Sequence, residues 1–222
     1  MDFDKYFLTL TDVPAAETLP MLTAAKRQWN YAALLSNKGE ITAEQITALS
    51  TMMGLLSLEI QNAAESAFAP ECWNGFAGLQ QLIVENCGKV SLVPIGALPS
   101  LNRLSLVGCR VTGESAIAGV RKLRQLSLTR CDVGDWAFLD GLTCGKSLTT
   151  LAIAGCDGLT AANFATRLPM LTDMALEDTA ITDLQPLATL VNLQRLYLYG
   201  TPVADYAPLI ALSALERLGC AQ

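Results

Sequence analysis

Histidine, the side chain most often used for general acid–base catalysis, is absent from this chain. Neither a Ser-His-Asp nor a Cys-His arrangement, the usual ways to activate a hydroxyl or a thiol, can therefore form. The acidic pair Glu177-Asp178 could exchange protons, but acid–base catalysis needs a cleft that shifts a carboxyl pKa. We expect this pair on a shallow, solvated surface, and we predict no catalytic residues and no enzymatic activity.

A second motif is close to a nucleotide-binding loop, Gly-x-x-x-x-Gly-Lys-Ser/Thr. Gly145, Lys146 and Ser147 fit that motif, but Asp140 stands where the first glycine is required. The loop must also lead into a helix, so that backbone N–H groups point at phosphates. The run that follows, Leu148-Thr-Thr-Leu-Ala-Ile, alternates as a strand does. We therefore predict no bound nucleotide and no other cofactor.

Cysteine could supply metal ligands or disulfides, and the chain contains seven cysteines. A zinc site needs closely spaced Cys-x-x-Cys pairs or histidines, and the sequence has neither. Four cysteines instead recur at intervals of 22, 22 and 25 residues: Cys87, Cys109, Cys131 and Cys156. Side chains at such equivalent positions run side by side rather than toward one another. We predict buried free thiols, with Cys220 also in the core, no metal, and a reducing compartment.

Composition and charge exclude two classes of partner. The net charge is −6 and the pI is about 4.7, whereas nucleic-acid binding needs a basic footprint. No stretch reaches the 18 uninterrupted apolar residues of a membrane span. The first residues, Met1-Asp-Phe-Asp-Lys, lack the basic-then-apolar order of a secretory signal. We expect a cytoplasmic protein that binds neither nucleic acid nor membrane.

The most informative pattern is a repeat of about 22 residues, each copy of which opens Leu-x-x-Leu-x-Leu-x-x-(Cys or Thr). The copies begin at Leu79, Leu101, Leu123, Leu148, Leu171, Leu193 and Leu215. They are separated by 22, 22, 25, 23, 22 and 22 residues. A fixed period with fixed apolar positions indicates a solenoid, in which no unit can bury its apolar face without a neighbour.

The elements of each unit follow from its pattern. The Leu-x-Leu alternation predicts a short strand with one buried face, and the remaining residues must return the chain to the next strand. On the return path Pro94, Pro186 and Pro208 align, each followed by an apolar residue. The Cys or Thr that ends each strand can bond backbone groups that the turn leaves unpaired. We predict an α/β solenoid with a parallel sheet on its concave face and irregular, 3-10 or short helical returns on its convex face.

Residues 79–218 resemble the leucine-rich repeat proteins, in the short-repeat form of the bacterial internalin-like group. The segment Thr179-Ala-Ile-Thr-Asp-Leu-Gln-Pro-Leu-Ala-Thr-Leu is especially close to that group's return. Two features depart from the family: cysteine replaces the usual Asn or Thr in four coils, and the third coil has three extra residues. The resemblance implies a right-handed superhelix or horseshoe. It also implies a protein-binding module, such as a regulator, an inhibitor of the immunity type, or an effector-type protein.

Residues 1–78 allow two interpretations. Thr42-Ala-Glu-Gln has the form of a capping box and favours a partly helical cap. Degenerate repeats are the alternative: Leu55-x-x-Leu-x-Ile and Trp29-x-x-Ala-x-Leu fit the template, and Phe3 to Leu10 alternates like a strand. We divide the chain into irregular repeats or a partly helical cap over 1–78 and regular repeats over 79–222, together one continuous solenoid domain.

The candidate binding residues are those between the template leucines, which point to the concave face. The middle of this face is small and nearly featureless, whereas its C-terminal end carries Tyr197 and Tyr199 on one strand. Tyrosine and arginine on a rigid sheet are typical of interface hot spots. We predict a protein-binding site of Arg195, Tyr197, Tyr199, Glu177, Asp178, Arg217 and Arg103. The alternative is that the tyrosines only cover the sheet.

The last repeat leaves a further alternative open. Leu215-Glu-Arg-Leu-Gly-Cys-Ala-Gln ends in the middle of a repeat strand, and an open strand edge invites pairing with another chain. The rival hypotheses to partner binding are end-to-end self-association through this strand, which a polar residue at Leu218 should disrupt, and a recognition fragment of a larger sensor or effector enzyme.

Overall fold

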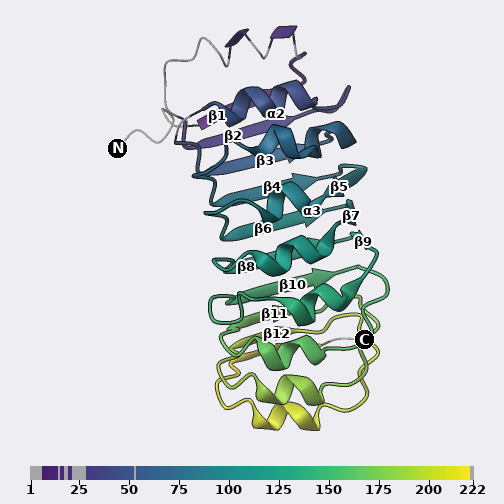
Figure 1. Cartoon of the computed structure of the whole chain (residues 1–222). Coiled ribbons are helices and arrows are strands. Elements are labelled where there is room, and N and C mark those ends of the chain that lie inside the picture. The colour runs from purple at the N-terminus through teal and green to yellow at the C-terminus, as the bar shows by residue number, and fades with distance from the viewer. Residues whose placement is uncertain (1–6, 15, 18–19, 22–28, 53, 221–222) are drawn as a thin grey trace.

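The computed structural model describes residues 7–14, 16–17, 20–21, 29–52 and 54–220. Its main feature is a parallel sheet of ten strands, stacked one per coil along the molecule (Figure 1). In spatial order the strands are β1 (Phe7–Thr11), β2 (Tyr31–Leu35), β3 (Ser57–Gln61), β4 (Gln81–Glu85), β6 (Arg103–Val107), β8 (Gln125–Thr129), β10 (Thr150–Ala154), β11 (Asp173–Ala175), β12 (Arg195–Tyr197) and β13 (Arg217–Gly219). The predicted α/β solenoid is therefore confirmed.

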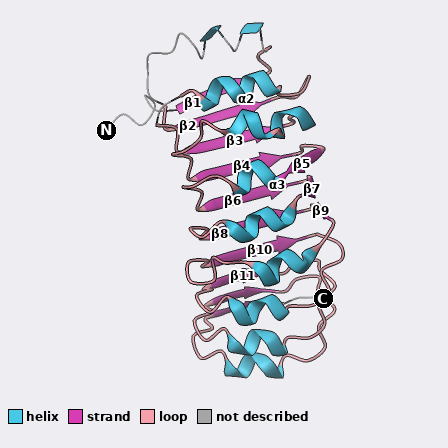
Figure 2. Cartoon of the chain, in the orientation of Figure 1, coloured by secondary structure: helices cyan, strands magenta, loops and turns pink. Residues whose placement is uncertain are grey.

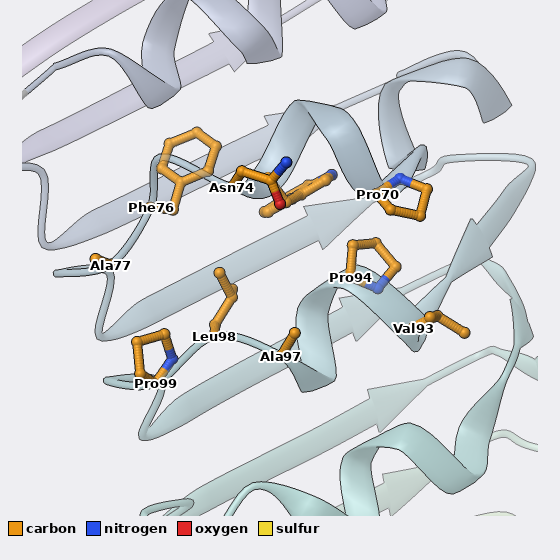
Figure 3. Close-up of a pocket in the computed structure, with 10 residues that line it drawn as sticks. Pro70, Asn74, Phe76, Ala77, Val93, Pro94, Ala97, Leu98 and Pro99 are labelled. Atoms are coloured by element: carbon orange, nitrogen blue, oxygen red, sulfur yellow. The ribbon is translucent and has the colours of Figure 1, made fainter.

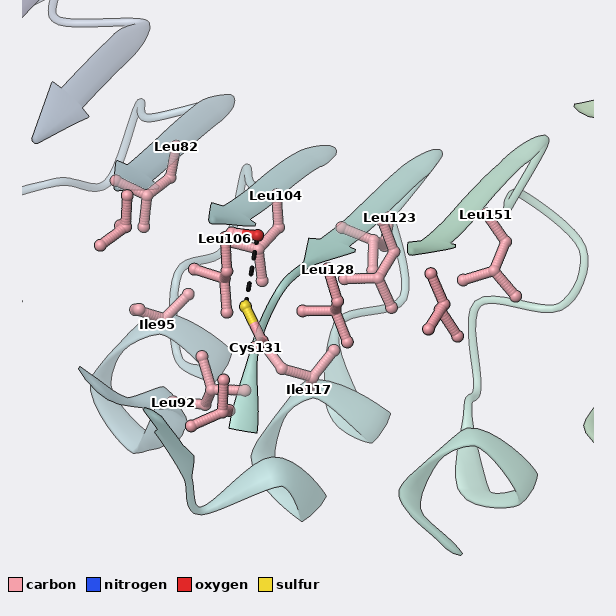
Figure 4. Packing of buried hydrophobic residues seen from close by; sticks show 14 of the residues in the cluster. Leu82, Leu92, Ile95, Leu104, Leu106, Ile117, Leu123, Leu128, Cys131 and Leu151 are labelled. Carbon is pink, nitrogen blue, oxygen red and sulfur yellow. Dashed lines mark hydrogen bonds between the residues drawn. The ribbon is translucent and has the colours of Figure 1, made fainter. Parts of the chain in front are cut away.

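The register of the sheet places equivalent residues of successive coils side by side. Leu82 pairs with Leu104, and Leu104 in turn pairs with Leu126. Because side chains alternate along a strand, the template leucines all point to one side, where they form a continuous buried core. Figure 4 shows these leucines meeting the apolar residues of the returns. The residues between the leucines line the opposite, concave face.

Short helices form the returns and cover the core on its convex side, as Figure 2 shows. They are α2 (Ala43–Ser50), η2 (Glu65–Phe68), η3 (Pro70–Trp73), α3 (Leu92–Gly96), η4 (Glu114–Gly119), η5 (Trp136–Gly141), η6 (Asn163–Arg167), η7 (Gln185–Thr189) and η8 (Ala207–Ala211); those labelled η are 3-10 helices. Two of the three aligned prolines, Pro186 and Pro208, stand in the first turn of η7 and η8, where the missing N–H has no helical partner to lose, and Pro94 lies within α3. Each return is completed by an inward apolar residue, such as the buried Leu187 or Leu209.

The N-terminal coils share the sheet register although their returns differ. Ala32 pairs with Leu58, and Leu58 pairs with Leu82, so the template copies at Trp29 and Leu55 fall on β2 and β3. The capping box is also present: Thr42 Oγ1 accepts from the Gln45 N–H, and the Gln45 side chain accepts from the Thr42 N–H. Both features of the sequence thus coexist. The boundary after residue 78 remains a prediction, and the proposed strand residues 3–6 lie outside the described ranges.

A ladder of small polar side chains closes the strand ends. The sulfur of Cys87 accepts from the Ala63 N–H at 3.1 Å, and the Cys131 thiol donates to the Leu106 carbonyl at 3.4 Å (Figure 4). In the last regular coils Thr179 and Thr201 donate to backbone carbonyls of their own turns. Side chains of the Cys/Thr column therefore bond backbone groups at each turn, as predicted from the repeat.

A second, smaller sheet follows these turns on the edge of the solenoid. It consists of β5 (Lys89–Ser91), β7 (Arg110–Thr112) and β9 (Asp132–Val133), which are parallel. Two ion pairs join neighbouring coils at this edge, Lys89–Glu65 at 2.7 Å and Arg110–Asp132 at 2.9 Å. Both pairs are well exposed, so their contribution to stability is small. Within the described ranges, no helix combines the length and apolarity needed to cross a bilayer.

Candidate functional site

The centre of the concave face consists of small side chains, as predicted. In register along the middle column stand Ser105, Ser127, Ala152 and Ala175. These side chains are partly exposed and carry no charge. A surface of this kind lets a partner's backbone approach the sheet closely but supplies little recognition itself. Recognition must therefore come from the larger residues that flank it.

At the C-terminal end of this face the two predicted tyrosines lie together. Strand β12 ends at Tyr197, and Tyr199 lies in the turn that follows, so the prediction that one strand carries both is wrong. The two rings still stack, with centroids 6.3 Å apart and planes within 24° of parallel. Both rings lie over Gly219 of the next strand, where an added Cβ would come within 2.7 Å of atoms of each ring. Gly219 is buried as a result, while Tyr199 remains 43% exposed. The tyrosines thus cover the sheet and also present aromatic surface to solvent.

Arg195 stands beside the tyrosines and is held in place. It pairs in register with Asp173 on the preceding strand, and its Nε donates to Asp173 Oδ1. That hydrogen bond, followed by the charge of the carboxylate, raises the Arg195 pKa above its usual value. On the other side Arg195 is in register with Arg217, which is exposed and has no ion-pair partner among the described residues. The end of the face therefore presents one neutralised and one free cation.

The other predicted site residues lie at increasing distance from this pair of rings. Glu177 is one coil before Tyr199, where its carbonyl accepts from Gly155 and its side chain is half-buried. Asp178 follows in a left-handed turn (φ 49°) and lies against Gly200. Arg103 is four strand spacings from β12, roughly 19 Å away. We name the group of Arg195, Tyr197, Tyr199 and Arg217 the C-terminal patch; Arg103 is not part of it.

A second aromatic group lies at the other end of the concave face, and the sequence analysis missed it. Phe7 and Tyr31 are in register on β1 and β2, with ring centroids 5.2 Å apart. Tyr31 Oη donates to Glu59 Oε2 on β3 at 2.5 Å. Partial burial, and then the bond to this carboxylate, raise the Tyr31 pKa to about 12. We name Phe7, Tyr31 and Glu59 the N-terminal patch. The template copies at Trp29 and Leu55 already place Tyr31 and Glu59 between template positions, but the concave columns were predicted only for the repeats that begin at Leu79.

An apolar hollow lies away from both patches, on the convex side. Its volume is about 290 Å³, and it opens between η3 and α3 (Figure 3). Its lining is almost wholly apolar: Pro70, Trp73, Asn74, Phe76, Ala77, Val93, Pro94, Ala97, Leu98 and Pro99. No titratable side chain lines it, so it lacks the groups that acid–base or nucleophilic chemistry requires.

The motif that is close to a nucleotide-binding loop is packed between coils. Ser147 Oγ lies 2.9 to 3.0 Å from three backbone carbonyls to which its single O–H can donate, those of Arg121, Leu123 and Cys144. An added Cβ at Gly145 would lie 2.3 Å from the Arg167 carbonyl. The segment leads into strand β10 instead of a helix. It is the three-residue insertion that the repeat spacing predicts.

All seven cysteines are free thiols, and six of them are buried. Cys220 is exposed, so the prediction that it lies in the core is wrong: it follows β13, beyond which no further strand stacks among the described residues. Within the cysteine ladder, a hydrogen bond from the side chain of Cys156 lowers the pKa of the Cys131 thiol to about 7. Within the described ranges, no three acidic or cysteine side chains come together as a metal site.

Comparison with known proteins identifies the architecture. No family model matches the chain, and no curated protein sequence matches it. Among solved structures, internalin C2 from Listeria monocytogenes is 25% identical with a TM-score of 0.65, covering 83% of this chain and 78% of that one. An internalin F from the same organism is 17% identical with a TM-score of 0.61, covering 95% and 71%.

A third similar structure comes from an animal. A chain of the mouse RP105/MD-1 complex is 18% identical with a TM-score of 0.67, covering 97% of this chain and 39% of that one. These likenesses agree with the template leucines, the ten-stranded parallel sheet and the 3-10 returns. The chain has the leucine-rich repeat fold.

Proposed function

We propose that this chain is a non-catalytic binding module whose concave face holds a protein partner, with the C-terminal patch as its centre. The observation that carries the proposal is the stacked pair Tyr197 and Tyr199 at the end of strand β12, packed over Gly219 and beside an ion-paired Arg195. Rings and guanidinium groups that are already fixed lose little conformational freedom on binding. Such residues dominate the energetics of protein interfaces.

Two further observations support a protein rather than a small molecule. The small central side chains of the concave face are partly exposed and would let a partner helix or loop lie along the sheet. One of the similar structures is a complex, mouse RP105/MD-1. The solenoid itself presents an extended surface of about 45 Å, from ten strands at roughly 4.8 Å each. Partner classes that fit are a regulated enzyme, a toxin that an immunity-type protein would neutralise, or the target of an effector.

Charge gives the partner a preferred chemistry at this end. Arg217 is exposed without an ion-pair partner among the described residues, and Arg195 lies beside it in register. A carboxylate from the partner could form an ion pair with Arg217, whose charge no described side chain neutralises. The proposed partner therefore offers an acidic residue next to an apolar group that packs on the tyrosines. We place this interaction in the cytoplasm of a bacterium, which the acidic composition and free thiols favour.

Self-association is the second candidate function, and one observation favours it. Leu218 is 41% exposed, whereas the equivalent Leu196 of the preceding strand is fully buried. β13 is also the last strand in the sheet order, so one of its edges is unpaired within the described ranges. Leu218→Asp would abolish concentration-dependent oligomers if this edge joins copies of the chain. Light scattering over a hundredfold concentration range measures this directly.

The experiment that tests the main proposal is affinity capture from the native organism's lysate, followed by mass spectrometry and a dissociation constant for the captured protein. We expect Tyr197→Ala/Tyr199→Ala to weaken binding by roughly a hundredfold or more. Ile210→Ala is the matched control, because Ile210 is 87% exposed on the convex helix η8. Circular dichroism must first show that both variants are folded.

The outcomes separate the hypotheses. A partner that is lost only in the tyrosine variant supports the C-terminal patch. Capture that is equally strong in both variants contradicts it and directs attention to the convex face. If no protein is enriched while light scattering detects oligomers that Leu218→Asp removes, self-association replaces partner binding as the function.

A further inference from the structure

The N-terminal patch combines two aromatic rings with a carboxylate on the same face of the sheet. We propose that Phe7, Tyr31 and Glu59 form a second contact point of the concave face, which binds a lysine or arginine side chain of the partner protein. The inference rests on the proposed function, since it assigns a further part of the same binding face. It adds a second site on the concave face. This site binds a cationic side chain, whereas the C-terminal patch is proposed to bind an acidic one.

The geometry of the patch comes from three adjacent strands. β1, β2 and β3 place Phe7 next to Tyr31, and Glu59 one alternation further along on the neighbouring strand. The Phe7 ring is tilted 50° against the Tyr31 ring and remains 48% exposed. Two rings at this angle form a corner in which an alkyl chain or a cation can contact both.

Glu59 is oriented by the tyrosine and still has acceptor capacity. Tyr31 Oη donates only to Oε2, and Oε1 has no hydrogen bond among the described residues. Because the Tyr31 pKa is raised to about 12, its hydroxyl remains a donor throughout the physiological range. The carboxylate is thus held in one orientation beside the rings, with one oxygen directed to solvent or to a ligand.

The charges around the patch favour a cation over other occupants. Glu59, and Glu85 on β4, have no ion-pair partner among the described residues, whose ion pairs all lie elsewhere. An acidic group would be repelled by both carboxylates. An apolar group would cover Glu59 and leave a charge desolvated, which is unfavourable. A lysine or arginine can pack its methylenes on Phe7 and Tyr31 and place its charge at Glu59.

The separation between the two patches indicates that the side chain bound at the N-terminal patch belongs to a protein. β3 and β12 are six strand spacings apart, roughly 29 Å. The middle column between them carries no charge: it holds Ile83 and then only serine and alanine. A ligand that contacts both patches must span this length, as a protein segment does. The partner would present a basic residue at the N-terminal patch and an acidic residue at the C-terminal patch. This polarity would also fix its direction along the face.

A peptide titration tests the cation site without knowledge of the partner. The probe is acetyl-Arg-Arg-Arg-amide, added to the full chain at constant ionic strength while NMR follows the tyrosine ring resonances. We expect the Tyr31 signals, identified by their loss in Tyr31→Phe, to shift with saturation, and those of Tyr197 and Tyr199 to remain unchanged. Acetyl-Glu-Glu-Glu-amide should not shift the Tyr31 signals.

Two isosteric variants make the test specific. Glu59→Gln should weaken the peptide about tenfold, because it removes the charge and keeps the shape. Asp140→Asn on η5 removes the same charge from the convex side and should change the affinity less than twofold, which controls for attraction to an acidic protein. Equal affinity for Glu59→Gln and the wild type, or no saturable shift at Tyr31, would overturn the inference.

Failure of this inference differs from failure of the proposed function. A null titration removes the N-terminal contact and leaves capture through Tyr197 and Tyr199 unaffected. A saturable titration with the expected variant pattern supports the cation site even where the tyrosine variant still captures its protein. In that case the C-terminal patch is the part that is wrong.

Discussion

The two ends of the concave face carry similar residues that are held in different ways. At the N-terminal patch a hydroxyl fixes the tyrosine by donating to a carboxylate, Glu59. At the C-terminal patch packing over Gly219 fixes the tyrosines, and the charged residue is tied separately to Asp173. The first end therefore presents negative charge and the second positive charge. The difference shows how one repeat template can place opposite chemistry at either end of a single sheet.

Truncation of the core beneath each patch should have the largest effect on stability. Leu58 and Leu196 occupy the same template position on β3 and β12, and both are fully buried. Leu58→Ala and Leu196→Ala should each lower the free energy of unfolding by about 3 kcal/mol, through lost burial and a residual cavity. Urea denaturation measures both. A cost below about 1 kcal/mol at one end alone would show that the two ends are not equally packed.

The second prediction concerns the packing of the C-terminal tyrosines. Gly219→Ala should destabilise the chain by about 1–2 kcal/mol and displace both rings, because the new Cβ would lie 2.7 Å from them. Ser127→Ala, in the same column at the centre of the face, should be nearly neutral. Thermal unfolding gives the energies, and tyrosine near-ultraviolet circular dichroism reports the rings. An unchanged tyrosine spectrum in Gly219→Ala would contradict the described contact.

The third prediction concerns the hydrogen bond between Tyr31 and Glu59 in the N-terminal patch. Tyr31→Phe should cost about 1 kcal/mol, because it removes a hydrogen bond to a carboxylate on a partly exposed surface. Tyr197→Phe should change stability by less than about 0.5 kcal/mol, since the described residues offer its hydroxyl no hydrogen bond. Denaturant titration of both variants measures the difference. Equal costs would remove the distinction between the two ends.

The same bond predicts a pH dependence with a definite sign. The Tyr31 pKa is about 12 in the folded chain, against an ordinary value near 10, so folding favours the neutral phenol. This stabilisation is fully present below pH 10 and is lost as the pH rises toward 12. The gap in unfolding free energy between wild type and Tyr31→Phe should therefore narrow over that range. A gap that is constant with pH would contradict the raised pKa.

The clarity of the repeat decided which of these features the sequence could predict. Over residues 79–222 the leucines fix the register, so Arg195, Tyr197 and Tyr199 were placed on one face with two-residue spacing. The pairing of Arg195 with Asp173 could also be predicted, because the two residues stand in the same column of the repeat. The close packing of the two tyrosine rings over Gly219 could not be predicted, since it depends on side-chain rotamers and on the absence of a Cβ in the next coil.

The N-terminal patch was hidden for a different reason. Phe7, Tyr31 and Ser57 are in register, but they are separated by 24 and 26 residues in the sequence. In β2 alanine replaces the first strand leucine, so the template is weak where the longer returns change its period. Burial of a β-sheet column can be predicted from periodicity only when the period is constant. The side-chain bond to Glu59 required the structure.

The smallest predicted effect separates binding from stability at the C-terminal patch. Arg195→Gln should change the free energy of unfolding by less than about 0.5 kcal/mol, because an ion pair on an exposed face contributes little. Its effect on partner affinity should be larger, since a buried interface removes the solvent that screens the charge. Parallel measurement of urea unfolding and of the dissociation constant checks both. Loss of stability without loss of affinity would mean that Arg195 belongs to the architecture of the sheet, and the binding energy would then rest on the tyrosines and Arg217.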